Sequence, residues 1–183
     1  SVCLVGSEMC IRDRYRALLL YGVAPSTEHI KLFNRIKNIQ TIIDVGSNRG
    51  QFALSACYFF PGSQIICFEP LKSAFCCLEK VFKNKTNLTL FNFAIGNEQK
   101  EIEINISNKE DSSSILEITQ KQETIFPNTQ KISSETIKLT TIEKVIQNKD
   151  LNSDVLMKID VQGYEMEVLQ GSKGLLSKLK YIY

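Results

Sequence analysis

Three acidic residues stand at or near the ends of short apolar segments, where their side chains could do chemistry. Glu69 and Asp160 each end such a segment, and Asp44 stands one residue before the end of 41–45. Short runs rich in β-branched and apolar residues predict strands that are buried on both faces. Because ligands of open α/β sheets bind at the carboxyl edge of the strands, we expect the three carboxylates to converge on one site.

The segment after the first predicted strand is a glycine turn, 46–50, that leads into a helix beginning at Gln51. Its spacing fails the dinucleotide fingerprint, which needs glycines at positions one, three and six. An acid followed by glycines two, four and six residues later is typical of S-adenosylmethionine sites. Asp44, Gly46 and Gly50 fit this pattern, and Asn48 replaces the middle glycine. Asparagine adopts left-handed backbone conformations more readily than most residues. A glycine turn that binds no ligand remains the alternative.

Glu69 lies 25 residues after Asp44 and directly precedes Pro70. Doubly wound nucleotide-binding folds place an acid at about this distance, where it accepts hydrogen bonds from ribose hydroxyls. We therefore expect Glu69 to bind a ribose. An acidic strand end before a proline turn, with no ligand, is the competing interpretation.

The remaining elements alternate between strand and helix patterns. Apolar spacing predicts a helix over 73–83, and the loop 94–97 follows the third strand. Segments 101–106 and 137–139 alternate polar and apolar residues, as half-exposed strands do. The polar stretch between them, with Ser112–Ser114, is either a loop over the site or a solvated segment. This order predicts an α/β fold with a doubly wound, mostly parallel sheet. The predicted strands are 41–45, 64–68, 88–93, 155–160 and 180–183, and a helix with Met166 and Leu169 facing inward precedes the last of them.

A short helix is expected before the first strand. Ser26 or Thr27 could cap it, and Ile30, Phe33 and Ile36 would share its inner face. The single histidine, His29, lies in this segment, and we expect it at the surface.

Composition indicates an ordinary globular protein of one domain. The formal net charge is +2, which favours neither a nucleic-acid nor a membrane partner. The six cysteines form no C-x-x-C pair, so we expect no metal site and reduced thiols in the cytoplasm.

The first residues look foreign to the domain. The string 4–13 resembles the translation of a sequencing-library adapter, and acids interrupt its apolar residues, which argues against a signal peptide. We therefore expect residues 1–14 to be a non-native extension and residues 15–183 to form the domain.

From about Ile39 to its end, the chain resembles the FkbM-type methyltransferases. Several blocks carry the resemblance in the right order, and Gln162 stands where the family often has glutamate. The blocks are Ile43–Phe52, Phe68–Pro70, Ala94–Asn97, the serines near Ser113, and Lys158–Glu165 with Val168, Leu169 and Gly171. Because the family's sheet continues further, the resemblance implies that two strands are missing after residue 183.

The resemblance implies a Rossmann-like class I methyltransferase fold and S-adenosylmethionine as the cofactor. It implies an O-methyltransferase acting on a hydroxyl of a sugar, a glycan or a secondary metabolite. Asp160 is the candidate catalytic residue, as base or orienter, or it binds the amino end of the cofactor. Lys158 either takes part in the site or only pairs with a nearby acid. The implied cofactor-binding residues are Asp44, Gly46, Ser47, Asn48, Gly50, Glu69, Pro70, Ala94 and Ile95.

Two rival functions stay open at this point. A nicotinamide-dependent oxidoreductase would share the fold and the ribose-binding acid, although the glycine spacing opposes it. A non-catalytic nucleotide-binding module would keep the fold without turnover.

Overall fold

The central element of the computed structural model is a parallel sheet of five strands, in the order β3-β2-β1-β7-β8. The structure describes residues 2–107, 131–146, 151 and 154–183. All five residues of β1 are buried, as the β-branched sequence predicts. The doubly wound, Rossmann-like fold is therefore confirmed. The strands are β1 (Thr41–Val45), β2 (Gln64–Phe68), β3 (Leu88–Phe91), β7 (Val155–Ile159) and β8 (Leu179–Ile182).

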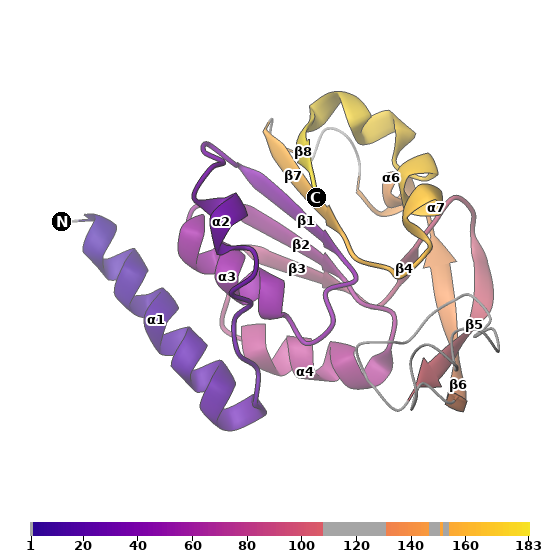
Figure 1. The fold of residues 1–183 in the computed structure, drawn as a ribbon, viewed down its shortest axis with the longest axis horizontal. Helices are drawn as coiled ribbons and strands as arrows, with labels where there is room; N and C mark the ends of the chain where they lie inside the picture. The colour runs from indigo at the N-terminus through magenta and orange to yellow at the C-terminus, as the bar shows by residue number, and fades with distance from the viewer. Residues whose placement is uncertain (1, 108–130, 147–150, 152–153) are drawn as a thin grey trace.

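Helices cover both faces of this sheet (Figure 1). Alternate residues of a strand point to opposite faces, and neighbours such as Ile42 and Ile43 accordingly lie in two different cores. The first core lies under α1, α2, α3 and α4, and the second lies under α6, α7 and the 3-10 helix η3. The helices are α1 (Val2–Tyr21), α2 (Ile30–Phe33), α3 (Gln51–Phe59), α4 (Lys72–Phe82), α6 (Ile142–Val145), α7 (Glu165–Gln170) and η3 (Lys173–Lys178).

A second sheet of three strands lies beside the first, in the order β4-β6-β5. The strands are β4 (Ala94–Ile95), β5 (Lys100–Ser107) and β6 (Lys131–Thr140). The loop expected over 94–97 therefore begins with two strand residues, because Ala94 and Ile95 pair with β6. The expected strand over 88–93 ends two residues early, because the Asn92 side chain donates to the carbonyl oxygens of Glu69 and Pro70. The polar stretch around Ser112–Ser114 lies outside the described residues.

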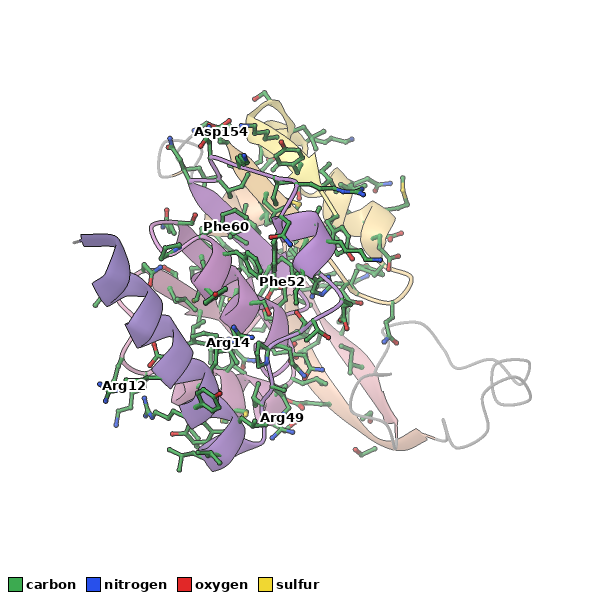
Figure 2. The ribbon with its side chains drawn as sticks, turned by 60° about the vertical axis from the view of Figure 1, so that its left-hand side comes forward. Arg12, Arg14, Arg49, Phe52, Phe60 and Asp154 are labelled. Carbon is green, nitrogen blue, oxygen red and sulfur yellow. The ribbon has the colours of Figure 1, made fainter. Side chains whose placement is uncertain are left out.

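The helix α1 packs across α3 and α4 (Figure 2). Ala17 is buried in the first core, the guanidinium of Arg14 lies 5.0 Å from the centroid of the Tyr58 ring, and Asp13 pairs with Lys85 at 2.6 Å. One continuous helix thus crosses residue 14. The expected boundary between an extension over residues 1–14 and a domain over residues 15–183 remains a prediction.

The segment before β1 differs from the expected capped helix. The helix α2 has only four residues, its N-cap is His29, and no side chain caps it. The expected caps are wrong because Ser26 is held against α3 instead, where its backbone oxygen accepts a hydrogen bond of 2.7 Å from the Ser55 hydroxyl. The expected inner residues Phe33 and Ile36 are buried.

Candidate active site

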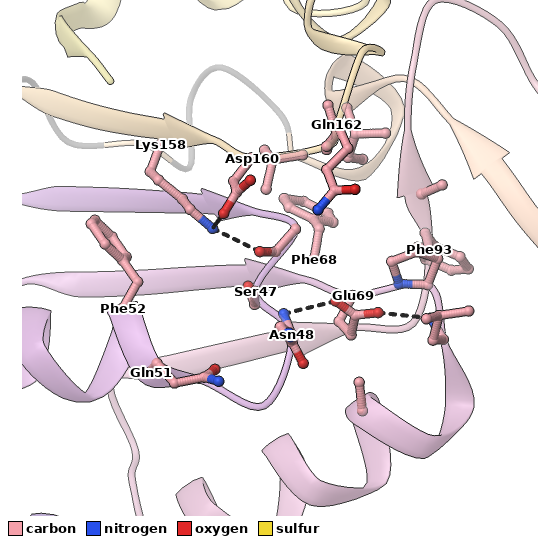
Figure 3. A pocket seen from close by; sticks show the side chains of 18 of the residues that line it. Ser47, Asn48, Gln51, Phe52, Phe68, Glu69, Phe93, Lys158, Asp160 and Gln162 are labelled. Carbon is pink, nitrogen blue, oxygen red and sulfur yellow. Dashed lines mark hydrogen bonds and ion pairs between the residues drawn. The ribbon is translucent and has the colours of Figure 1, made fainter. Parts of the chain in front are cut away.

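A cavity of about 530 Å³ opens at the carboxyl edge of β1, β2 and β7 (Figure 3). This volume lies in the usual range for small-molecule sites, about 300–1,000 Å³. Glu69 from the end of β2 and Asp160 from the end of β7 line it together, although their strands are far apart in the sequence. Asp44 does not line it, because its side chain is fully buried beneath the floor.

The glycine turn forms the floor of the cavity. Gly46, Asn48 and Gly50 have φ of 77°, 49° and 96°, so the left-handed conformation expected at Asn48 is present. A Cβ on Gly46 would lie 2.1 Å from the backbone oxygen of Asp160. Glycine at position 46 therefore allows the ends of β1 and β7 to approach each other. Gly50 starts α3 under Phe82 and does not reach the cavity.

The Glu69 carboxylate connects this turn to the end of β2. One of its oxygens accepts a hydrogen bond of 2.7 Å from the Asn48 backbone N–H, and the other accepts one of 2.9 Å from the Leu71 backbone N–H. Burial raises the pKa of Glu69 to about 7, against the opposing effect of these two donors. A carboxylate offers about four acceptor positions, so the two oxygens retain capacity for ligand hydroxyl groups.

Lys158 links the ends of β1 and β7. Its Nζ lies 3.0 Å from Asp44 Oδ1 and 3.6 Å from Asp160 Oδ2, and it donates a hydrogen bond of 2.7 Å to the Gly46 backbone oxygen. Burial alone would lower the pKa of Lys158, but Asp44 and Asp160 raise it above its ordinary value. Lys158 is therefore a buried cation that holds the glycine turn and pairs with both acids. Asp44 Oδ2 has no hydrogen-bond partner among the described residues.

The charges on the cavity wall favour a cationic ligand. Glu28, Glu69 and Asp160 contribute three carboxylates, whereas Lys158 is the only lysine among the described lining residues and is already paired. No arginine occurs among these lining residues. A pyrophosphate group would therefore meet an excess of negative charge here. The lining also has an apolar part, with Phe93, Ala94, Ile95 and Ile104.

The structure brings most of the expected residues together. Those that line the cavity are Gly46, Ser47, Asn48, Glu69, Pro70, Ala94, Ile95 and Asp160. Asp44 and Gly50 do not line it, and both support the turn from behind.

Several lining residues were not expected from the sequence in this role. Phe52 and Gln162 lie within matched blocks, so the resemblance could have indicated them. Lys158, for which the sequence left a role in the site open, also lines the cavity. His29 lies outside every block, and the expectation that it is at the surface is wrong. Only 9% of His29 is exposed, because Phe52, Phe33 and Tyr183 pack against its ring.

Comparison with known proteins gives a family and a curated relative. Residues 44–183 match the model of the methyltransferase FkbM domain. The chain is 28% identical over 178 residues to the 2-O-methyltransferase NoeI of Sinorhizobium fredii (strain NBRC 101917 / NGR234). The aligned region covers 88% of this chain and 71% of that protein.

Two solved structures resemble the chain more distantly. One is the precorrin-6y C5,15-methyltransferase from Geobacter metallireducens GS-15, with 12% identity, a TM-score of 0.41, and coverage of 87% of this chain and 64% of that chain. The other is the plantazolicin methyltransferase BpumL in complex with SAH, with 12% identity, a TM-score of 0.36, and coverage of 84% of this chain and 40% of that chain. The chain therefore spans less than two thirds of either structure.

Proposed function

The chain belongs to the FkbM methyltransferase family, and we propose that it transfers a methyl group from S-adenosylmethionine to a hydroxyl oxygen. The proposed acceptor is a sugar, a glycan or a secondary metabolite. The relative named 2-O-methyltransferase supports oxygen as the atom that is methylated. The observation that carries the proposal is the acidic cavity, in which Glu69 follows β2 and Asp160 follows β7.

The residues of the cavity fit the proposed cofactor. S-adenosylmethionine combines a flat aromatic adenine, a ribose diol and a cationic sulfonium with an amino acid end. Glu69 would accept hydrogen bonds from the ribose hydroxyls, and the wall at Ala94 and Ile95 would pack against the adenine. The glycine turn would bring backbone close to the ligand, and Asp160 with the buried Asp44 would supply negative charge for the cationic end.

The chemistry that remains for the protein is positioning and proton transfer. When bound, S-adenosylmethionine supplies an electrophilic methyl group whose carbon–sulfur bond breaks with its electron pair left on sulfur. Asp160 stands at the β7 end of the cavity with a side chain that is 65% exposed, and Lys158 lies 3.6 Å from its carboxylate. Asp160 would orient the acceptor hydroxyl or accept its proton, or it would bind the amino end of the cofactor. Orientation of two reactants contributes roughly 7–11 kcal/mol in well-aligned systems.

We further propose a cytoplasmic location. Cys67, Cys76 and Cys77 are not in disulfides, which agrees with a reducing compartment. Among the described residues, no helix has the length and apolar character needed to cross a membrane.

Methyl transfer can be measured directly with S-adenosylmethionine that carries a labelled methyl group. The enzyme is incubated with a panel of monosaccharides, oligosaccharides and polyhydroxylated metabolites, and each product is analysed by mass spectrometry and NMR. The proposal predicts label on a hydroxyl oxygen of at least one acceptor. The Asp160→Asn variant should bind S-adenosylhomocysteine and lose most of the turnover if Asp160 acts on the acceptor. Label found only on nitrogen or carbon would contradict O-methyl transfer.

A further inference from the structure

We propose that His29 is a catalytic residue that accepts the proton of the acceptor hydroxyl. This inference deepens the proposed function and rests on it. His29 comes from the segment before β1, outside the matched family domain, and it lines the same cavity as Asp160 and Glu69. It is the only histidine in the sequence.

The position of His29 follows from the order of the strands. Glu69 ends β2 and Ala94–Ile95 comes after β3, so the ribose and adenine would lie on the β2 and β3 side. β1 separates β2 from β7 in the sheet. A cofactor lying along this edge would pass Gly46, and its reacting end would then be on the β7 side. Lys158, Asp160 and His29 line the cavity there.

The surrounding residues fix the ring of His29. The ring lies edge-on to Phe52 and Tyr183, with centroids 5.0 Å and 5.2 Å away. Nδ1 lies 3.1 Å from the Tyr183 hydroxyl, and Nε2 lies 3.4 Å from Glu28 Oε1. A mobile surface histidine has no such constraints. The side chains of Phe52 and Tyr183 therefore hold one orientation of the imidazole at the cavity wall.

These partners allow a specific proton path. In the tautomer with the proton on Nδ1, the ring donates to the Tyr183 oxygen and Nε2 keeps its lone pair. The Glu28 side chain is 73% exposed, so it can turn toward solvent and admit an acceptor hydroxyl to Nε2. As the acceptor oxygen bonds to the methyl carbon, its proton moves to Nε2, while the electrons of the carbon–sulfur bond stay on sulfur. Solvent then takes the proton from the imidazolium.

Burial and the charges that face His29 together favour the neutral imidazole, the form that can accept a proton, at neutral pH. Burial lowers the pKa of His29, Glu28 raises it, Lys158 lowers it, and Asp44 and Asp160 raise it. The net shift is downward from 6.5, so the neutral imidazole dominates at pH 7. Tyr183, after β8, contacts the ring through its hydroxyl.

The single histidine permits a test that needs no turnover. The imidazole NMR signal of the whole protein reports on His29 alone, and the His29→Gln variant confirms the assignment. Its titration midpoint should lie below 6.5 in the free protein. Saturating S-adenosylmethionine should lower it further than S-adenosylhomocysteine does, because only the former carries a sulfonium cation near the ring. Equal midpoints with the two ligands would place His29 away from the reacting end and overturn the proposal.

Turnover provides the second measurement. His29→Gln should lower kcat by about 10²–10⁴-fold and leave the affinity for S-adenosylhomocysteine within about twofold of wild type. At saturating S-adenosylmethionine, the acidic limb of the wild-type pH profile of kcat should disappear in His29→Gln, persist in Asp160→Asn and shift in Tyr183→Phe. Added imidazole should restore part of the activity of His29→Ala. Unchanged kcat in a folded His29→Gln variant would exclude His29 as the base, although methyl transfer itself would stand. Failure of the wild-type protein to bind either ligand would instead contradict the proposed function.

Discussion

Replacing Glu69 with glutamine removes a group that is charged above about pH 7 and preserves the shape of the side chain. Both oxygens of Glu69 accept hydrogen bonds from backbone N–H groups, at Asn48 and Leu71. A glutamine amide has one oxygen and one NH₂ group, so its NH₂ would face one of these two donors. The variant therefore loses a bond to a charged acceptor, a bond worth about 1.5–3 kcal/mol, and it offers the ribose hydroxyls a weaker acceptor.

We expect Glu69→Gln to weaken the binding of S-adenosylhomocysteine by roughly 1–3 kcal/mol, which is about 5- to 150-fold in the dissociation constant. Isothermal titration calorimetry measures this change. Glu79→Gln is the matched control, because it makes the same chemical change on the exposed face of α4. Its affinity should equal that of wild type.

The pH dependence of binding follows from the raised pKa of Glu69. The ionised carboxylate is the better acceptor for ribose hydroxyls, so wild-type affinity should increase as pH rises through about 7. Glu69→Gln should lack this increase. The contribution of Glu69 to folding stability has the opposite pH dependence. It is fully present below pH 4.5 and is lost as pH rises through about 7, because the carboxyl group has the higher pKa in the folded state. Unchanged affinity and an unchanged pH profile in Glu69→Gln would show that Glu69 does not contact the ligand.

Three further changes test the parts that support the cavity. Lys158→Met leaves the buried Asp44 without its cation and should lower the free energy of unfolding in urea by about 3–5 kcal/mol; adding Asp44→Asn should recover most of the loss, and no recovery would contradict the ion pair. Gly46→Ala should lower the melting temperature far more than Gly22→Ala. Both glycines have positive φ, but only a Cβ at Gly46 would meet backbone atoms, those of Asp160, within 4 Å. Equal effects would exclude a steric clash between this Cβ and Asp160. Removing residues 1–13 should leave the melting temperature within about 2–4 °C of the value for the full chain, a difference that corresponds to about 1 kcal/mol at this chain length. A larger drop would show that this segment stabilises the domain.

Local sequence signals were sufficient for the first βαβ unit and for much of the cavity. β-branched residues determined β1, and the positive φ values at Gly46, Asn48 and Gly50 explain why the turn needs these residue types. The convergence of Glu69 and Asp160 followed from the rule that parallel strands end at one edge. These features depend on neighbouring residues and on topology, both of which a sequence pattern records.

The features that the sequence did not reveal depend on long-range contacts. His29 is buried because Phe52 and Tyr183 pack on its ring, and Tyr183 is 154 residues away. The pairing of β4 with β6 joins segments separated by more than 40 residues, so periodicity in either segment could not predict a second sheet. Asp44 is buried behind the cavity, where its partner is Lys158 from the distant strand β7.

Equilibrium dialysis with labelled S-adenosylmethionine tests most directly whether this cavity holds the proposed cofactor. Wild-type protein is dialysed against the labelled ligand alone, and then with excess unlabelled S-adenosylhomocysteine or NADH as competitor. The acidic wall and the position of Glu69 predict one bound ligand per chain, displaced by S-adenosylhomocysteine and retained with NADH. Displacement by NADH, or no binding of S-adenosylmethionine by the folded protein, would contradict the assignment of this cavity.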